Sequence, residues 1–140
     1  MNKTASEICQ LVGVNAVTDI TGFGLLGHAL EMAQAGKEEF VLNYQDIPVI
    51  PEAIDSVARG FVPGGAKANH LYTAPNVDYP PSLQREQHWL LNDPQTSGGL
   101  LISVSESKAE RLRDRMTDAG IKSPVIGYVT AERAGKIIIR

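Results

Sequence analysis

Cysteine is nearly missing from this chain of 140 residues, which contains only Cys9. A single cysteine permits no internal disulfide, so a reducing cytoplasm is the expected location. Lys and Arg together number 13 against 16 acidic residues and form no cluster, which argues against a nucleic acid or an anionic membrane surface as partner. No apolar run approaches the ~18 residues of a membrane span, and the first ten residues lack the layout of a signal peptide. These absences leave a globular domain of ordinary composition.

Glycine is concentrated in the stretch TDITGFGLLGH, residues 18–28. Gly22, Gly24 and Gly27 bracket the start of an expected helix, where glycine lets backbone N–H groups turn toward a ligand. The positive end of the helix dipole favours an anion there, and the carboxylate of Asp19 just upstream could hold Mg²⁺ that bridges to phosphate. The alternative is structural: Asp19 or Thr21 caps the helix, and the glycines permit close packing. The spacing alone leaves both interpretations open.

Two further stretches have a similar composition. NDPQTSGGLL, residues 92–101, precedes an expected strand, and its Thr96, Ser97 and Gly98 form either a second anion-binding loop or a simple turn, which is favoured. VPGGAKAN, residues 62–69, is expected to be a turn, with Lys67 as a solvated charge.

The histidines show no metal-ligand spacing with one another or with Cys9. His28 lies on an expected helix and is interpreted as a packed or capping residue, whereas His70 and His88 fall in a region without a clear pattern. Cys9 is expected to be a small buried hydrophobe. Trp89 is expected to anchor the 92–99 loop to the core.

Apolar periodicity predicts an α/β sandwich, in which helices pack on a mixed sheet. Helices are expected at 4–12, at 25–35 with Gly36 as its stop, from Pro51 to Gly60, and from a capping box at Ser107 and Glu110 to Gly120. Strands are expected at 38–44, 99–104, 124–129 and 136–140, the last two as a hairpin. Residues 61–97 are expected to be mostly loop, with one short helix near 82–91.

The three motifs TDITGFGLLGH, PGGxxxN and NDPQTSGGLL, in this order, resemble the C-terminal domain of the selenophosphate synthetase (selenide, water dikinase) family. The resemblance runs from about residue 5 to the C-terminus. The wider superfamily includes aminoimidazole ribonucleotide synthetase, whose related glycine-rich loop is not accompanied by DPQTSGG. The resemblance implies the C-terminal domain of the aminoimidazole ribonucleotide synthetase-like fold, spanning 1–140.

For the whole enzyme, the resemblance implies a two-domain subunit that forms a homodimer through its N-terminal domain. ATP, selenide and water would give selenophosphate, AMP and phosphate for selenocysteine and selenouridine synthesis. The N-terminal domain would carry the nucleophile, so no catalytic residue is expected in this chain and the chain alone should be inactive. The missing domain should leave exposed apolar surface near residues 4–30. The site residues implied are Asp19 as a Mg²⁺ ligand, with Thr18, Thr21, Gly22, Gly24, Thr96, Ser97 and Gly98 toward ATP.

Two departures from the family pattern are visible. Cys9 does not match the family's nucleophile, and the usual Thr-x-Arg-Asn after Pro-Gly-Gly is here Ala66, Lys67, Ala68 and Asn69. Lysine could replace the arginine as a point charge but not bidentately. Two other hypotheses stay open: a domain of another ATP-dependent synthetase of the superfamily, and a stand-alone binding domain without chemistry.

Overall fold

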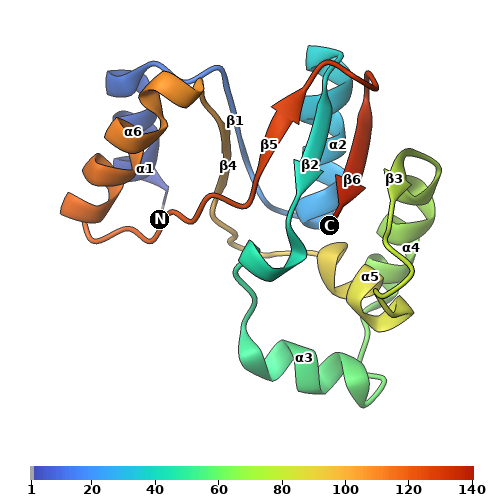
Figure 1. Ribbon diagram of the computed structural model, residues 1–140. Helices are drawn as coiled ribbons and strands as arrows, with labels where there is room; N and C mark the ends of the chain where they lie inside the picture. Colours follow the sequence, from blue (N-terminus) through green and yellow to red (C-terminus); the bar gives the residue numbers. More distant parts are fainter. Residues whose placement is uncertain (1) are drawn as a thin grey trace.

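The structure of the chain is a computed structural model that describes residues 2–140. Helices and strands are interspersed along the chain (Figure 1). In order they are α1 (Lys3–Val12), β1 (Ala16–Asp19), α2 (Gly24–Gly36), β2 (Glu39–Leu42), η1 (Tyr44–Asp46), α3 (Pro51–Ala58), α4 (Gly64–Thr73), η2 (Ala74–Asn76), β3 (Val77–Asp78), α5 (Arg85–Leu91), β4 (Leu100–Ser103), α6 (Glu106–Asp118), β5 (Gly127–Thr130) and β6 (Lys136–Ile139). No helix within residues 2–140 is long and apolar enough to cross a membrane.

The strands form two sheets. The larger one has the order β3-β6-β2-β5, with β6 parallel to both of its neighbours and β5 antiparallel to β2. The smaller one is the antiparallel pair β1-β4, in which Asp19 lies opposite Leu100. The expected α/β architecture with helices on a mixed sheet is therefore confirmed, and the second, small sheet is a feature that the periodicity did not predict.

The main core lies between α2 and the four-stranded sheet, which α2 covers on one face (Figure 1). Leu26, Ala29, Leu30 and Ala33 recur at helical spacing and are fully buried, as the pattern predicted. They meet side chains from β2 and β6, strands whose central position buries apolar residues. This packing fixes the helix whose N-terminus follows the TDITGFG motif.

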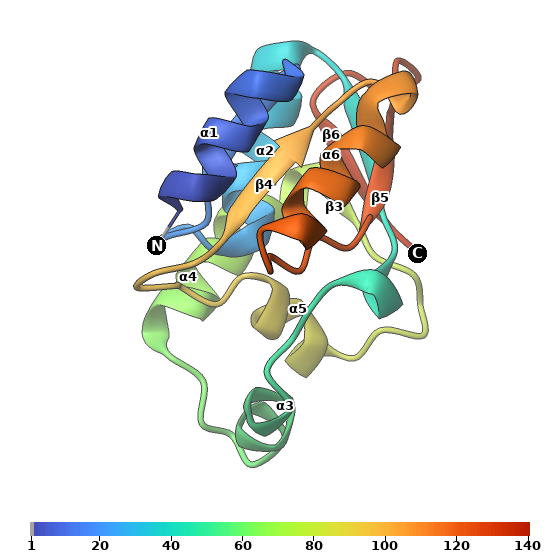
Figure 2. The same ribbon diagram turned by 90° about the vertical axis from the view of Figure 1, so that its left-hand side faces the viewer.

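A second core joins α1 and α6 over the small sheet. Ala5, Cys9 and Val12 of α1 pack against Leu112 and Met116 of α6. Cys9 is only 2% exposed, so its interpretation as a small buried hydrophobe is confirmed. In contrast, α3 packs on α5, at the end of the molecule remote from α1 and α6 (Figure 2).

The predicted hairpin between 124–129 and 136–140 is wrong. β5 and β6 do not pair with each other, because β2 lies between them and pairs with both. A strand prediction from local pattern favours the nearest partner in sequence, whereas the structure places the fully buried strand β2 between β5 and β6.

The expectation that residues 61–97 are mostly loop is also wrong. They contain α4, η2, β3 and α5, and the segment interpreted as a Pro-Gly-Gly turn is the first turn of α4, with Pro63 as the residue before it. Few apolar residues mark α4 because its buried side is formed by Ala66, Asn69 and Thr73. A helix whose buried face is small and polar has no hydrophobic periodicity to read.

Two expected helix ends lie elsewhere. The left-handed residue that ends α2 is Lys37, with φ of 55°, and Gly36 is still helical. The last long helix begins after Ser105, so the capping box assigned to Ser107 and Glu110 is wrong.

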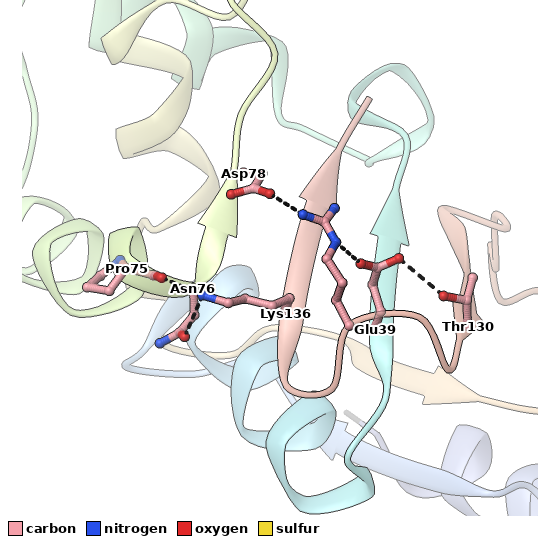
Figure 3. A network of polar contacts seen from close by, with 7 residues as sticks. Glu39, Pro75, Asn76, Asp78, Thr130 and Lys136 are labelled. Carbon is pink, nitrogen blue, oxygen red and sulfur yellow. Dashed lines mark hydrogen bonds and ion pairs between the residues drawn. The ribbon is translucent and has the colours of Figure 1, made fainter.

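Polar contacts join Arg133, in the segment between β5 and β6, to side chains on β2 and β3 (Figure 3). The side chain of Glu39 is 3% exposed and accepts hydrogen bonds from Arg133 Nε, at 2.6 Å, and Thr130 Oγ1, at 3.1 Å. Arg133 Nη1 also donates to Asp78 on β3 at 2.7 Å. These hydrogen bonds to Glu39 and Asp78 raise the pKa of the Arg133 guanidinium, which remains charged. The buried Glu39 carboxylate on β2 is thus linked directly to Thr130 on β5 and, through Arg133, to Asp78 on β3.

Candidate functional site

The first and third motifs lie side by side because they continue the β1-β4 pair. Ile20 N donates to Gly99 O at 2.9 Å, and Gly98 N donates to Ile20 O at 3.1 Å. A side chain at Gly98 would overlap the carbonyl of Ile20. The absence of a Cβ therefore allows the 92–99 loop to approach the residues that follow Asp19.

A second close approach occurs at the start of α2. Gly24 has φ of 67°, and a Cβ there would lie 2.7 Å from the carbonyl carbon of Asn92 and 2.9 Å from the Asp93 carbonyl oxygen. The N-terminus of α4 joins the same place, since a Cβ on Gly65 would lie 2.7 Å from Cγ of Pro94. The structure thus brings together all three glycine-rich stretches that the sequence singled out, although 33 residues lie between the first and the second and 22 between the second and the third.

Asn69 bridges two of these stretches from α4. Its Nδ2 donates to the carbonyl of Gly22 at 2.9 Å and to the carbonyl of Asn92 at 3.0 Å. The residue is 9% exposed. Sequence reasoning noted this asparagine as part of PGGxxxN but did not foresee the bridge.

Asn92 holds the third stretch to the body of the domain. Its side chain is fully buried, accepts a hydrogen bond from Thr73 Oγ1 at 2.9 Å, and donates to the His88 carbonyl at 2.7 Å and to Tyr79 OH at 3.2 Å. Burial raises the pKa of the neighbouring Asp93 carboxyl, and a hydrogen bond from Gln95 opposes that shift. The anchor of the 92–99 loop is therefore Asn92.

Trp89, the expected anchor, is only partly buried and is contacted by cations. Arg85 Cζ lies 4.7 Å and Lys67 Nζ lies 5.3 Å from the centre of the Trp89 ring. Lys67 is exposed, as expected of a solvated charge, and it also makes a cation–π contact that directs its ammonium toward α5.

The N-terminus of α2 has no side-chain cap. The N-cap residue is Phe23, and neither Asp19 nor Thr21 forms a capping hydrogen bond within the described residues 2–140. Thr21 Oγ1 is instead hydrogen-bonded to His28 Nε2 at 3.1 Å, and His28 Nδ1 to Glu31 at 3.0 Å. The structural interpretation of Asp19 and Thr21 as helix caps is thus wrong, while His28 is packed, as expected.

Asp19 is exposed at the end of β1. With Thr18 and Val17 it lines an open hollow of about 490 Å³, together with the start of α1 (Asn2, Lys3 and Ser6) and Leu100. No group of three or more His, Cys, Asp or Glu that could hold a metal ion occurs within residues 2–140. The chain therefore offers one accessible carboxylate here and not a complete metal cage.

Of the remaining predicted ligand residues, Thr18 lines this hollow, whereas the others are not among its lining residues. Gly22, Thr96 and Ser97 are exposed, and Thr18 and Thr21 are half-buried. The N–H groups of Gly24 and Gly98 already donate to the carbonyls of Thr21 and Ile20, respectively. These two glycines therefore supply close approach, and any backbone donors would come from their neighbours.

His70 and His88, which the sequence left without an interpretation, form a cluster with Tyr79. The Tyr79 and His88 rings stack at 3.8 Å, and the two imidazoles lie 5.4 Å apart. His70 Nδ1 and His88 Nε2 are buried and have no hydrogen-bond partner among residues 2–140. Burial lowers the pKa of both imidazoles, and the His70 charge lowers that of His88 further. The cluster lies beside Asn92 and so supports the anchor of the loop.

Comparison with known proteins places this geometry in context. The family model described as "AIR synthase related protein, C-terminal domain" matches residues 1–140. The chain is 42% identical to a selenide, water dikinase of Carboxydothermus hydrogenoformans over 142 residues, which cover 100% of this chain and 40% of that protein. It is 42% identical to a selenide, water dikinase of Clostridioides difficile, with 92% and 37% covered, and 50% identical to one of Caldanaerobacter subterraneus, with 83% and 33% covered. The chain thus spans about 40% or less of the length of these relatives.

Proposed function

The chain belongs to the AIR synthase related protein family, as its C-terminal domain, and from this premise we propose that it is the C-terminal domain of a selenophosphate synthetase. The complete enzyme would use ATP, selenide and water to form selenophosphate, AMP and phosphate. The observation that carries the proposal is the 42% identity along the whole chain to a protein named selenide, water dikinase. The 140 residues would contribute one side of the ATP site and would be inactive alone.

Asp19 is the proposed Mg²⁺ ligand. Its carboxylate is exposed in an open hollow, which suits a site that a second domain completes. Mg²⁺ in nucleotide sites is commonly held by one or two carboxylates together with phosphate oxygens and water, so a single carboxylate from this chain fits a shared site. Bound Mg²⁺ would neutralise charge on the phosphates, which is the main requirement of phosphoryl transfer.

The glycine-rich loops would approach the phosphates. The first-turn N–H groups of α2 have no side-chain cap, and the unpaired N–H groups and dipole of a helix N-terminus favour an anion. Thr18, Thr21, Gly22 and Gly24 would line this side, with Thr96, Ser97 and Gly98 facing it from the other loop. The juxtaposition of these two loops supports the proposal, because their separation in sequence gives them no local reason to meet.

The remaining length of the enzyme would form an N-terminal domain that carries the nucleophile and mediates homodimer formation. Three large apolar residues within 4–30, Leu11, Val17 and Phe23, are between 44% and 60% exposed. Contact with a second domain would cover such surface. The enzyme would be cytoplasmic and would need neither nucleic acid nor membrane.

The experiment is Asp19→Asn in the complete polypeptide. Asparagine keeps the size but removes the charge, so selenide-dependent ATP consumption should fall at least tenfold, excess Mg²⁺ should restore part of it, and the melting temperature should stay unchanged. Asp114→Asn on α6, where the aspartate is also exposed, is the matched control and should behave as wild type.

A wild-type polypeptide that consumes ATP without selenide, or consumes none, would contradict the proposed activity. Full activity in the Asp19→Asn variant would contradict only the assignment of the metal ligand.

A further inference from the structure

The carboxamide of Asn69 is the one side chain of α4 seen to connect two motif loops directly among residues 2–140. Both of its recorded hydrogen bonds come from Nδ2, to Gly22 O at 2.9 Å and to Asn92 O at 3.0 Å. A primary amide nitrogen carries two hydrogens, so this group can satisfy both carbonyls at once. The residue is buried and is not among those that line the open hollow beside Asp19.

The identity of the residue follows from this geometry. An aspartate of the same shape has no donor and would direct oxygen at two carbonyl oxygens. A serine retains one donor on a shorter arm. A glutamine has the donors but adds a methylene where the side chain is already enclosed. Of these four residues, only asparagine supplies two donors at this distance.

The two carbonyls belong to segments that meet at several places. Ile20 is hydrogen-bonded to Gly98 and Gly99, and Gln95 N donates to Thr21 O at 2.9 Å. Gly24 lies directly against the Asn92 peptide, and a Cβ there would meet it at 2.7 Å. Gly22 is three residues beyond Asp19, and Asn92 opens the loop that carries Thr96 and Ser97. Asn69 adds two side-chain hydrogen bonds to these backbone contacts and so helps to hold the two segments together.

We propose that Asn69 is a positioning residue that sets the relative placement of the Asp19–Gly24 segment and the 92–99 loop for ligand binding. This inference rests on the proposed function and extends it to a residue that does not contact the ligand. Asn69 acts through the backbone of Gly22 and Asn92, so its loss changes the alignment of the Asp19 carboxylate without removing any ligand atom. Groups that orient metal ligands from behind typically affect metal affinity or activity by ~10- to 100-fold.

The test is Asn69→Asp in the complete polypeptide, with the exposed Asn15→Asp as matched control. We expect the Mg²⁺ concentration for half-maximal selenide-dependent ATP consumption to rise at least tenfold, more than the KM for selenide changes. Hydrogen exchange should become faster in 20–24 and 92–95 while the rest of the domain keeps its protection. Asn69→Ser, with one donor, should give an intermediate shift and serves as the second variant if the aspartate prevents folding.

An unchanged Mg²⁺ dependence, with activity falling only in proportion to the folded fraction, would overturn the proposal and leave Asn69 a structural residue. Unchanged exchange in both segments would also overturn it. If the wild-type polypeptide shows no selenide-dependent ATP consumption, the proposed function fails, and the exchange comparison, made with and without Mg²⁺, still decides whether Asn69 aligns the two segments.

Discussion

Replacing Asn92 with alanine removes three hydrogen bonds from a fully buried position. Those bonds join Asn92 to Thr73 at 2.9 Å, to the His88 carbonyl at 2.7 Å and to Tyr79 at 3.2 Å. A net contribution of about 1 kcal/mol for each bond gives a loss of about 3 kcal/mol. That is a large part of the ~5–15 kcal/mol that stabilises a typical domain, and it corresponds to a fall in melting temperature of about 6–12 °C for a domain of this size.

The assay is urea unfolding of the chain, followed by circular dichroism, with Asn15→Ala as the exposed control. The control should change the free energy of unfolding by less than about 0.5 kcal/mol. Asn92→Asp keeps the acceptor for Thr73 but loses both donated bonds and buries a charge, so it should destabilise at least as much as alanine. A loss below about 1 kcal/mol for Asn92→Ala would refute the role of Asn92 as the anchor of the 92–99 loop.

Three further outcomes are expected. Arg133→Met should lower the melting temperature by several degrees, because it leaves the buried carboxylate of Glu39 without its positive partner. In a Glu39→Gln background, where that buried charge is absent, the same substitution should cost less. Equal losses in the two backgrounds would show that the two residues are uncoupled. Since burial lowers the pKa of His70 and His88 in the folded state, the unfolded chain binds more protons below about pH 6.5, so unfolding free energy should fall as pH drops from 8 toward 5. Replacing both histidines by glutamine should flatten that slope, and an unchanged slope would assign it to other groups. Burial also raises the pKa of the Cys9 thiol, so a thiol reagent should react with it only at the rate of unfolding, whereas immediate reaction of the native chain would contradict its burial.

The sequence pattern was sufficient to predict those structural features that depend on residues close together in the sequence. The stripe of Leu26, Ala29, Leu30 and Ala33 predicted α2 and its buried face, because helical spacing places those positions on one side. Gly24 was recognised as a position where a missing Cβ allows close approach or close packing, whereas Gly98 was expected only in an anion-binding loop or a turn. The burial of Cys9 followed from its apolar neighbours. The motif order was likewise sufficient to indicate the family.

What the pattern missed depends on partners distant in sequence. α4 was interpreted as loop because its buried side holds Asn69 and Thr73, whose partners lie 47 and 19 residues away, at Gly22 and Asn92. The expected β5–β6 hairpin failed for the same reason, since the strand that separates them, β2, comes almost 90 residues earlier.

Sequence alone therefore determined the helices with an apolar stripe, the glycine-rich loops and the family to which the chain belongs. Only the tertiary structure decided that the three glycine-rich stretches meet, that α2 begins without a side-chain cap, and that Asn69 and Asn92 hold the meeting point together. The physical reason is that a buried polar side chain is specified by the donor or acceptor it finds across the fold. Such a partner leaves no periodic signal in the residues on either side.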